Sequence, residues 1–251
     1  MRILLPALWA TAVFAQQLPS ASAPVIPPPL RVVAQLVNDF GNTARYAADD
    51  QKLAASETVP NRVVFMGDSI TDGWGRGNNG SVFFPGKPYV NRGISGQTTA
   101  QMLLRFYPDV IALNPKAVVI LAGTNDIGGN LGPVSMESIE QNLAAMTDLA
   151  RANNIKVVLA SLTPVCDYHR PQTATRPPEK ILELNRWIKS YTASHHFVYL
   201  DYFSATVDDK GFFKAEITGD GLHPNAAGYE IMGPLAEKAI AQALSGEGSS
   251  R

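Results

Sequence analysis

Five short apolar runs separated by helical patterns constrain the fold of this chain most strongly. The runs occupy residues 63–66, 89–91, 117–122, 156–162 and 197–202. Between the later runs, apolar residues recur at helical spacing, as at Ile139, Leu143, Met146 and Leu149. Because the runs lack alternating polar residues, the strands that they predict are covered on both faces. The sequence therefore predicts an α/β fold, a three-layer α/β/α sandwich around a five-stranded parallel sheet.

The first residues have the pattern of a signal peptide spanning residues 1–15. They combine one positive charge, an apolar stretch of about a dozen residues, and small residues at the two positions that define a cleavage site after Ala15. A membrane anchor would need roughly 20 apolar residues, and the polar Gln16 and Gln17 come too early for that. We therefore expect a secreted or periplasmic protein with no stable membrane insertion after cleavage.

The remaining chain is predicted to form a single domain. Residues 16–29 are rich in proline and predict an extended linker, and residues 245–251 predict a flexible tail. The domain then spans residues 30–244, and its first segment, residues 30–55, predicts a helix or a helix pair packed on the core. Pro234 lies inside the last helical pattern and is expected to kink or split that helix.

The net charge and the cysteine content indicate which partners are not favoured and what stabilises the fold. A formal net charge of −1 gives no global attraction to nucleic acid or to an anionic membrane. The single Cys166 cannot form a disulfide within the chain, so stability must come from core packing. Nothing in the sequence sets the oligomeric state.

Reactive side chains follow the predicted strands at the point where each strand ends. Ser69 comes directly after the first strand, Gly93 follows the second and Asn125 follows the third. A long segment after the fifth strand brings Asp220 and His223. Because the carboxyl ends of parallel strands share one edge of the sheet, where ligands bind in open α/β folds, these residues are expected to meet there.

This set of residues suits acyl transfer. Ser69 is a candidate nucleophile, and an imidazole such as that of His223 can take its proton near neutral pH. Asp220, three residues earlier, can accept the other ring N–H and stabilise the imidazolium. The backbone N–H groups of Ser69 and Gly93, with the Asn125 amide, could stabilise charge on the carbonyl oxygen. The alternative is that Ser69 merely caps the next helix.

At this point the sequence resembles the SGNH (GDSL-type) hydrolases. Four blocks occur in order, GDSI with Ser69, NRG with Gly93, GTND with Asn125, and DGLHPN with Asp220 and His223, within residues 62–244. The resemblance implies a flavodoxin-like fold and ester hydrolysis without metal or cofactor. It also implies that Ser69 is the nucleophile and that Gly93 and Asn125 belong to the oxyanion hole. Because the family covers lipases, thioesterases, arylesterases and carbohydrate acetylesterases, it leaves open which small-molecule or carbohydrate ester is the substrate.

Two predicted loops, residues 71–88 and 163–178, flank this edge of the sheet. The first is rich in Gly and Asn and the second in Pro, Arg and Thr, which indicates a shallow, open site. We therefore expect short acyl chains, with acetyl esters of carbohydrates as candidates. The alternatives are a lysophospholipase or thioesterase acting on longer chains, or a secreted binding module without catalysis. The side chains of these loops that could contact a substrate are Trp74, Arg76, Asn79, Tyr168, His169, Arg170 and Arg176. Trp74, Phe83 and Phe84 could form a narrow acyl slot.

Other motifs indicate structure rather than chemistry. Residues 75–80 spell GxGxxG, but no helical pattern follows, so a dinucleotide site is not expected. Cys166 and His169 lie three residues apart without a second thiol or a histidine cluster, which favours packing over a nucleophile or a metal site. His195 and His196 end a helical pattern, where a cation is favourable.

Overall fold

The structure is a computed structural model that describes residues 28–55, 59–76 and 79–246. The predicted signal peptide, residues 1–15, and nearly all of the predicted linker lie outside the described residues. None of the described helices combines the length and the apolar character needed to span a bilayer.

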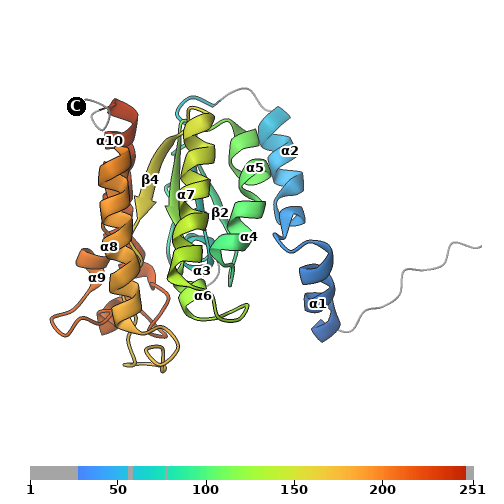
Figure 1. The fold of residues 1–251 in the computed structure, drawn as a ribbon. Helices are drawn as coiled ribbons and strands as arrows, with labels where there is room; N and C mark the ends of the chain where they lie inside the picture. The colour runs from blue at the N-terminus through green and yellow to red at the C-terminus, as the bar shows by residue number, and fades with distance from the viewer. Residues whose placement is uncertain (1–27, 56–58, 77–78, 247–251) are drawn as a thin grey trace, which may run out of the picture.

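A five-stranded, fully parallel sheet forms the centre of the fold (Figure 1). Its strands are β1 (Val63–Gly67), β2 (Tyr89–Gly93), β3 (Ala117–Leu121), β4 (Lys156–Ala160) and β5 (Val198–Leu200), in the order β2-β1-β3-β4-β5. Gly67 pairs with Gly93 on one side and Leu121 on the other, so the three strands end level with one another. This is the flavodoxin-like strand order, in which the chain reverses its direction of winding beside β1. The predicted fold class is confirmed.

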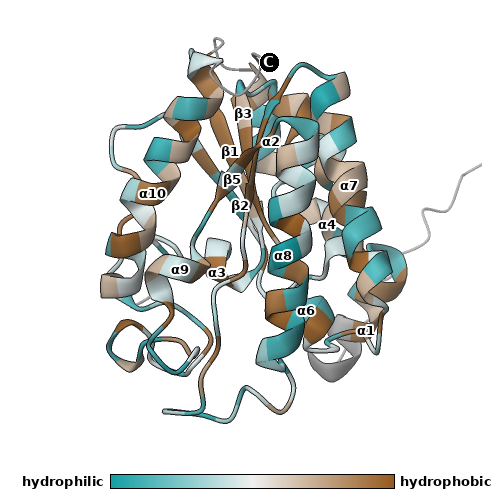
Figure 2. Ribbon diagram, turned by 60° about the vertical axis from the view of Figure 1, so that its left-hand side comes forward, coloured by the Kyte–Doolittle hydropathy of each residue, from teal (hydrophilic) through white to brown (hydrophobic). Residues whose placement is uncertain are grey.

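Helices cover both faces of the sheet. They are α1 (Pro28–Asn38), α2 (Ala47–Ala55), α3 (Ser69–Asp72), α4 (Thr99–Leu104), α5 (Phe106–Asp109), α6 (Thr124–Ile127), α7 (Met136–Ala152), α8 (Pro178–His195), α9 (Phe203–Thr206) and α10 (Ala226–Ser245), with short 3-10 helices η1 (Thr43–Arg45), η2 (Ile111–Leu113) and η3 (Ala215–Ile217). Figure 2 shows α10 on one side of the sheet and α7 and α8 on the other. Helix α10 packs on β3, β4 and β5, while α7 and α8 pack on β4 and on each other.

The core follows the predicted pattern of strands covered on both faces. All five positions of β1 and of β3 are buried. On α7, the predicted apolar face places Ile139, Leu143 and Met146 in the core, although Leu149 is 38% exposed. Burial of each such large side chain contributes about 1.5–3 kcal/mol.

Two local expectations differ from the structure. Helix α1 starts at Pro28, inside the predicted linker. Among its described side chains, Val33 and Val37 were expected to pack on the core but are 54% and 77% exposed. Helix α10 continues through Pro234, so the predicted split is wrong. Proline removes one intrahelical hydrogen bond, and burial of Met232 and Ala236 on either side keeps the helix on the sheet.

A buried arginine ties the ends of β1 and β2 together. Arg105 is fully buried, and its guanidinium donates to the carbonyl oxygens of Gly67 at 3.0 Å and Arg92 at 2.8 Å. Its Nε donates to Gln97 Oε1 at 2.5 Å, and Asp109, also fully buried, accepts from Nη1 at 2.7 Å. One fixed cation thus joins two strand ends to the loop that follows β2.

Replacement of Arg105 by Met should therefore destabilise the fold strongly. The change leaves the Asp109 carboxylate buried without its partner, which typically costs about 3–5 kcal/mol. Urea unfolding measures the loss, with Arg151→Met as the control, because the Arg151–Asp148 pair is exposed and should change stability by less than about 1 kcal/mol. Equal effects of the two substitutions would contradict this role for Arg105.

Candidate active site

The turn from β1 into α3 places Ser69 at the carboxyl edge of the sheet. Asp68 precedes the helix and accepts a hydrogen bond from the Ile70 N–H at 2.9 Å, which caps α3. Helix α3 lies directly on the end of β2, since a Cβ atom at Gly93 would stand 2.1 Å from the Asp72 nitrogen. Only glycine fits there, so this contact fixes where α3, and with it Ser69, lies.

The structure brings Ser69, His223 and Asp220 into one hydrogen-bonded chain. Ser69 Oγ lies 2.8 Å from His223 Nε2, and His223 Nδ1 lies 2.7 Å from Asp220 Oδ2. A carboxylate can only accept, so the proton between Asp220 and the ring is assigned to Nδ1. Nε2 of a neutral ring is then the acceptor for the serine hydroxyl, which is the arrangement needed to activate a nucleophile.

Hydrogen bonds between its own side chains and its own backbone hold the segment that carries His223. Asp220 Oδ1 accepts from the N–H groups of Leu222 at 3.0 Å and His223 at 2.8 Å, and Thr218 Oγ1 donates to the His223 carbonyl at 2.8 Å. Partial burial acts to raise the pKa of Asp220, but the hydrogen bonds from His223 and Leu222 hold that pKa below its usual value. Asp220 is therefore ionised and can stabilise positive charge on the imidazole.

These groups open into a cavity of about 380 Å³. Its lining is formed by Ser69, Gly73, Asn79, Ser95, Gly219, Asp220, His223, Pro224, Asn225 and Tyr229. Tyr229 is anchored, because its hydroxyl donates to the Ile70 carbonyl at 2.7 Å. Ser69, Asp220 and His223 thus face a cavity with many polar residues, whereas the predicted Gly93 and Asn125 do not line it.

The sequence-based role of Gly93 is wrong. Its N–H donates to Asn91 Oδ1 at 2.9 Å and is not available to a substrate. Gly96, three residues later in the same loop, has φ +80° and an N–H with no hydrogen-bond acceptor among the described residues. Its neighbour Ser95 lines the cavity, so the Gly96 N–H is the better placed donor. Gly93 ends β2 and Gly96 follows three residues later, and the sequence offered no signal that the Asn91 side chain accepts from the Gly93 N–H.

Asn125 is buried where β3 passes into α6, as expected for a strand-end residue. Its Nδ2 donates to the Gln97 carbonyl at 3.0 Å, and its Oδ1 accepts from Arg176 Nη2 at 3.4 Å. One of the two Nδ2 hydrogens has no partner among the described residues. The side chain therefore keeps a donor free while its other polar groups are fixed.

Asp68, next to the serine, is fully buried and its Oδ2 has no hydrogen-bond partner among the described residues. Burial raises the pKa of Asp68 to about 6, although the Ile70 N–H and nearby His223 and Arg176 act in the opposite direction. This carboxyl group therefore titrates near the lower end of the physiological pH range.

Among the aromatic residues of the first flanking loop, Trp74 belongs to the core, and the partly buried Phe83 and Phe84 pack against it. Trp74 is only 4% exposed, its Nε1 donates to the Val82 carbonyl at 3.2 Å, and its ring packs against Phe83, Phe84 and Tyr229. Phe65 of β1 lies in the same cluster. These rings stabilise the loop and do not form an open acyl slot in the catalytic cavity.

Of Tyr168, Arg170 and Arg176 in the second loop, Arg176 is the one that reaches the site. Arg176 reaches Asn125, whereas Tyr168 donates to Asp208 at 2.7 Å and stacks edge-on against Phe212. Arg170 is exposed. Sequence analysis grouped these three residues together because a loop position alone does not tell which side chain turns inward.

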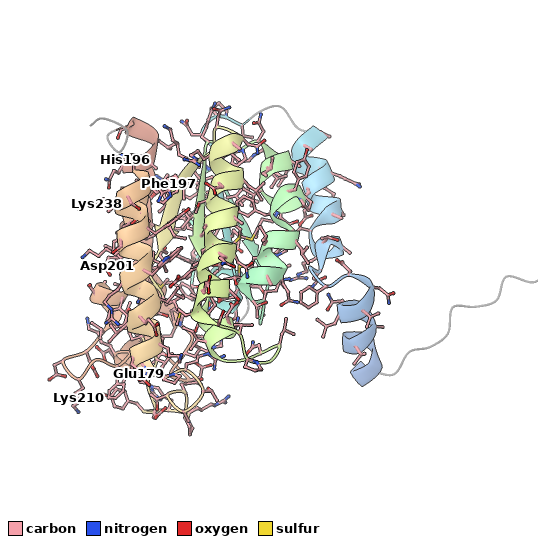
Figure 3. All side chains as sticks on the ribbon, viewed as in Figure 1. Glu179, His196, Phe197, Asp201, Lys210 and Lys238 are labelled. Atoms are coloured by element: carbon pink, nitrogen blue, oxygen red, sulfur yellow. The ribbon has the colours of Figure 1, made fainter. Side chains whose placement is uncertain are left out.

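Cys166, His169, His195 and His196 do not line the catalytic cavity, whereas Asn79 of the motif at residues 75–80 does. Cys166 is buried against Phe213, as expected for packing, and His169 contacts the Ala215 carbonyl at 3.0 Å. Figure 3 places His196 at the opposite end of the molecule from Glu179, which lies near the start of α8 on the catalytic side. Among the described residues, no group of three or more His, Cys, Asp or Glu side chains is arranged to hold a metal ion.

Comparison with known families identifies the class of protein. Residues 65–231 match the GDSL-like Lipase/Acylhydrolase family. The chain belongs to this family of acylhydrolases and esterases, which confirms the resemblance found in the sequence.

Individual relatives share the fold and ester chemistry. A GDSL-like lipase structure from Bacteroides thetaiotaomicron is 40% identical, with a TM-score of 0.74, over 82% of this chain and 100% of that one. Esterase TesA of Pseudomonas aeruginosa is 29% identical over 55% of this chain, and an acetylxylan esterase of Geobacillus stearothermophilus is 24% identical over 68% of this chain and 90% of its own length. The chain spans only 46% and 62% of the first two curated relatives that it matches.

The buried Asp68 should make the stability of the protein depend on pH. Its folded pKa of about 6 exceeds the ordinary value of 3.8, so between these values the folded state binds more protons and stability falls as pH rises. Asp68→Asn removes this titration and keeps an oxygen to cap Ile70. The stability of the variant relative to wild type should rise by up to about 3 kcal/mol between pH 4 and pH 7, at about 1.4 kcal/mol per pKa unit.

Denaturant unfolding at a series of pH values measures this difference, with Asp148→Asn as an exposed control. A stability difference between Asp68→Asn and wild type that stays constant across the range would contradict the assignment.

Proposed function

We propose that this protein is a serine esterase that hydrolyses carboxylic esters through an acyl-enzyme on Ser69. The observation that carries the proposal is the chain Ser69 Oγ–His223 Nε2–Asp220, with distances of 2.8 Å and 2.7 Å, at the wall of a cavity. Membership of an acylhydrolase family supports it independently. A serine that only capped a helix would need neither the imidazole nor the carboxylate.

In the acylation step, Ser69 Oγ attacks the ester carbonyl carbon while His223 Nε2 takes the hydroxyl proton. Asp220 stabilises the imidazolium that forms. The tetrahedral intermediate collapses, the bond between the carbonyl carbon and the alcohol oxygen breaks, and His223 returns the proton to the departing alcohol. The acyl group then remains on Ser69.

In the deacylation step, water attacks the acyl-enzyme and gives a proton to His223 Nε2. Collapse of the second tetrahedral intermediate releases the acid and returns the proton to Ser69 Oγ. Both intermediates carry negative charge on the former carbonyl oxygen. The donors available for that charge are the Ser69 N–H at the start of α3, the Gly96 N–H and the free Asn125 Nδ2–H.

The dimensions of the site favour a short acyl group. The cavity of about 380 Å³ is lined largely by small and polar residues, and Trp74 is part of the core instead of lining it. Acetyl esters of carbohydrates are the candidate substrates, consistent with similarity to an acetylxylan esterase. A second cavity of about 240 Å³ shares Tyr229 with the first and is also lined by Trp74, Val82 and Phe84.

Removal of the nucleophile tests the reaction. Ser69→Ala should lower kcat for p-nitrophenyl acetate by about 10⁴- to 10⁶-fold without unfolding the protein, because a single hydroxyl is lost. Ser194→Ala is the control, since Ser194 is an exposed serine of α8 that does not line the cavity and donates its hydroxyl to the Tyr191 carbonyl at 3.0 Å. Near-normal turnover by folded Ser69→Ala would show that another group is the nucleophile.

A series of acyl chain lengths tests the substrate class. The kcat/KM for p-nitrophenyl esters of two to sixteen carbons should be greatest at two to four carbons, because longer chains bury few methylenes, each worth about 0.8 kcal/mol. A maximum at eight carbons or more would show that the cavity beside Tyr229 accepts the chain, which would favour lysophospholipase or thioesterase activity.

A further inference from the structure

Arg176 lies at the end of the loop after β4, two residues before α8 begins, and it reaches back toward the ends of β1 and β3. Its guanidinium lies directly against the backbone after α6. A Cβ atom at Gly128 would stand 2.8 Å from Arg176 Cζ. The Nε atom is buried and has no hydrogen-bond acceptor among the described residues. A side chain held this closely, with one donor unused, is not a solvated surface arginine.

The contact between Arg176 and Asn125 determines how the amide is oriented. Asn125 Oδ1 accepts from Arg176 Nη2 at 3.4 Å, while Nδ2 donates to the Gln97 carbonyl at 3.0 Å. If the amide rotated by half a turn, Nδ2 would face the guanidinium and Oδ1 would face a carbonyl oxygen. Both contacts would be repulsive because donor would meet donor and acceptor would meet acceptor. The observed orientation is therefore the stable one, and the contact with Arg176 is one of the two hydrogen bonds that favour it.

A glutamine connects Arg176 to the segment that carries the imidazole. Gln172 Oε1 accepts from Arg176 Nη1 at 3.4 Å, and Gln172 Nε2 donates to the Asp220 carbonyl at 3.1 Å. The backbone N–H of Gln172 is held by Asp167 Oδ1 at 2.6 Å. Arg176 is thus in contact with Gln172 on one side and with Asn125 on the other.

The charges nearby keep the guanidinium in this place. Asp68 and Asp220 both attract Arg176, and the guanidinium remains protonated although burial lowers its pKa. Asp68 is the buried carboxyl group next to the nucleophile, so the attraction draws Arg176 inward. This attraction keeps the guanidinium in contact with Asn125 Oδ1.

We infer that Arg176 is a positioning residue of the oxyanion hole, which holds the Asn125 amide so that its free Nδ2–H faces the reacting carbonyl oxygen. This inference rests on the proposed function. Arg176 acts through Asn125 and is not required to touch the substrate. A planar guanidinium supports the amide and Gln172 at the same time, whereas the compact ammonium of a lysine cannot reproduce both contacts.

The first test is the kinetics of Arg176→Met. Loss of one oxyanion donor typically lowers kcat by about 10²- to 10³-fold, so misorientation of that donor should lower kcat by about 10- to 100-fold with less than a threefold change in KM. Arg176→Lys should recover only part of this loss. Arg170→Met, an exposed position of the same loop, is the control and should leave both constants unchanged.

A double-mutant cycle with Asn125→Ala separates positioning from a merely structural role. In the Asn125→Ala background, Arg176→Met should lower kcat by less than threefold further, because the amide that it positions is absent. A loss as large as that in wild type, or a rise in KM with unchanged kcat, would overturn the inference. Near-ultraviolet circular dichroism identifies variants that fail to fold, in which case the same cycle is run with Arg176→Lys.

The inference and the proposed function fail in distinguishable ways. If wild type shows no hydrolysis that depends on Ser69, the proposed function fails. If hydrolysis depends on Ser69 but Arg176→Met behaves like Arg170→Met, only the role of Arg176 fails.

Discussion

The close contact of α3 with the end of β2 determines the rest of the catalytic arrangement. A Cβ atom at Gly93 would stand 2.1 Å from the Asp72 nitrogen, so the two backbones meet without a side chain between them. Asn91 and Arg105 stabilise this junction, the first by capping the Gly93 N–H and the second by binding the carbonyl oxygen of Arg92. Because the junction is rigid, Ser69 is presented at a fixed place on the sheet edge.

The strand order then brings the other functional groups to the same place. β1 lies between β2 and β3, and the direction of winding reverses beside β1, which is where open α/β sheets bind ligands. Ser69 follows β1 and Asn125 follows β3, so nucleophile and amide donor come from neighbouring strands. His223 arrives from a long segment after β5, and its hydrogen bonds with Asp220 keep it oriented.

The sequence was sufficient to predict the sheet and the group of reactive residues, because apolar runs and strand-end positions are local patterns. It could not distinguish Gly93 from Gly96, since both lie at the carboxyl end of β2 and the difference depends on which N–H the Asn91 side chain binds. The inward turn of Arg176 depends on Gly128 and Asn125, which lie far away in the sequence. Tertiary packing determines which partners these side chains contact, so no local sequence pattern predicts them.

Covalent labelling can test whether Ser69 is a nucleophile that His223 activates. A fluorophosphonate probe reacts with an activated serine and leaves an adduct that peptide mass spectrometry can locate. We expect a single adduct on Ser69 in the wild type and labelling slowed by at least about 10³-fold in His223→Ala. Absence of an adduct on Ser69, or equally fast labelling without His223, would contradict these roles of Ser69 and His223.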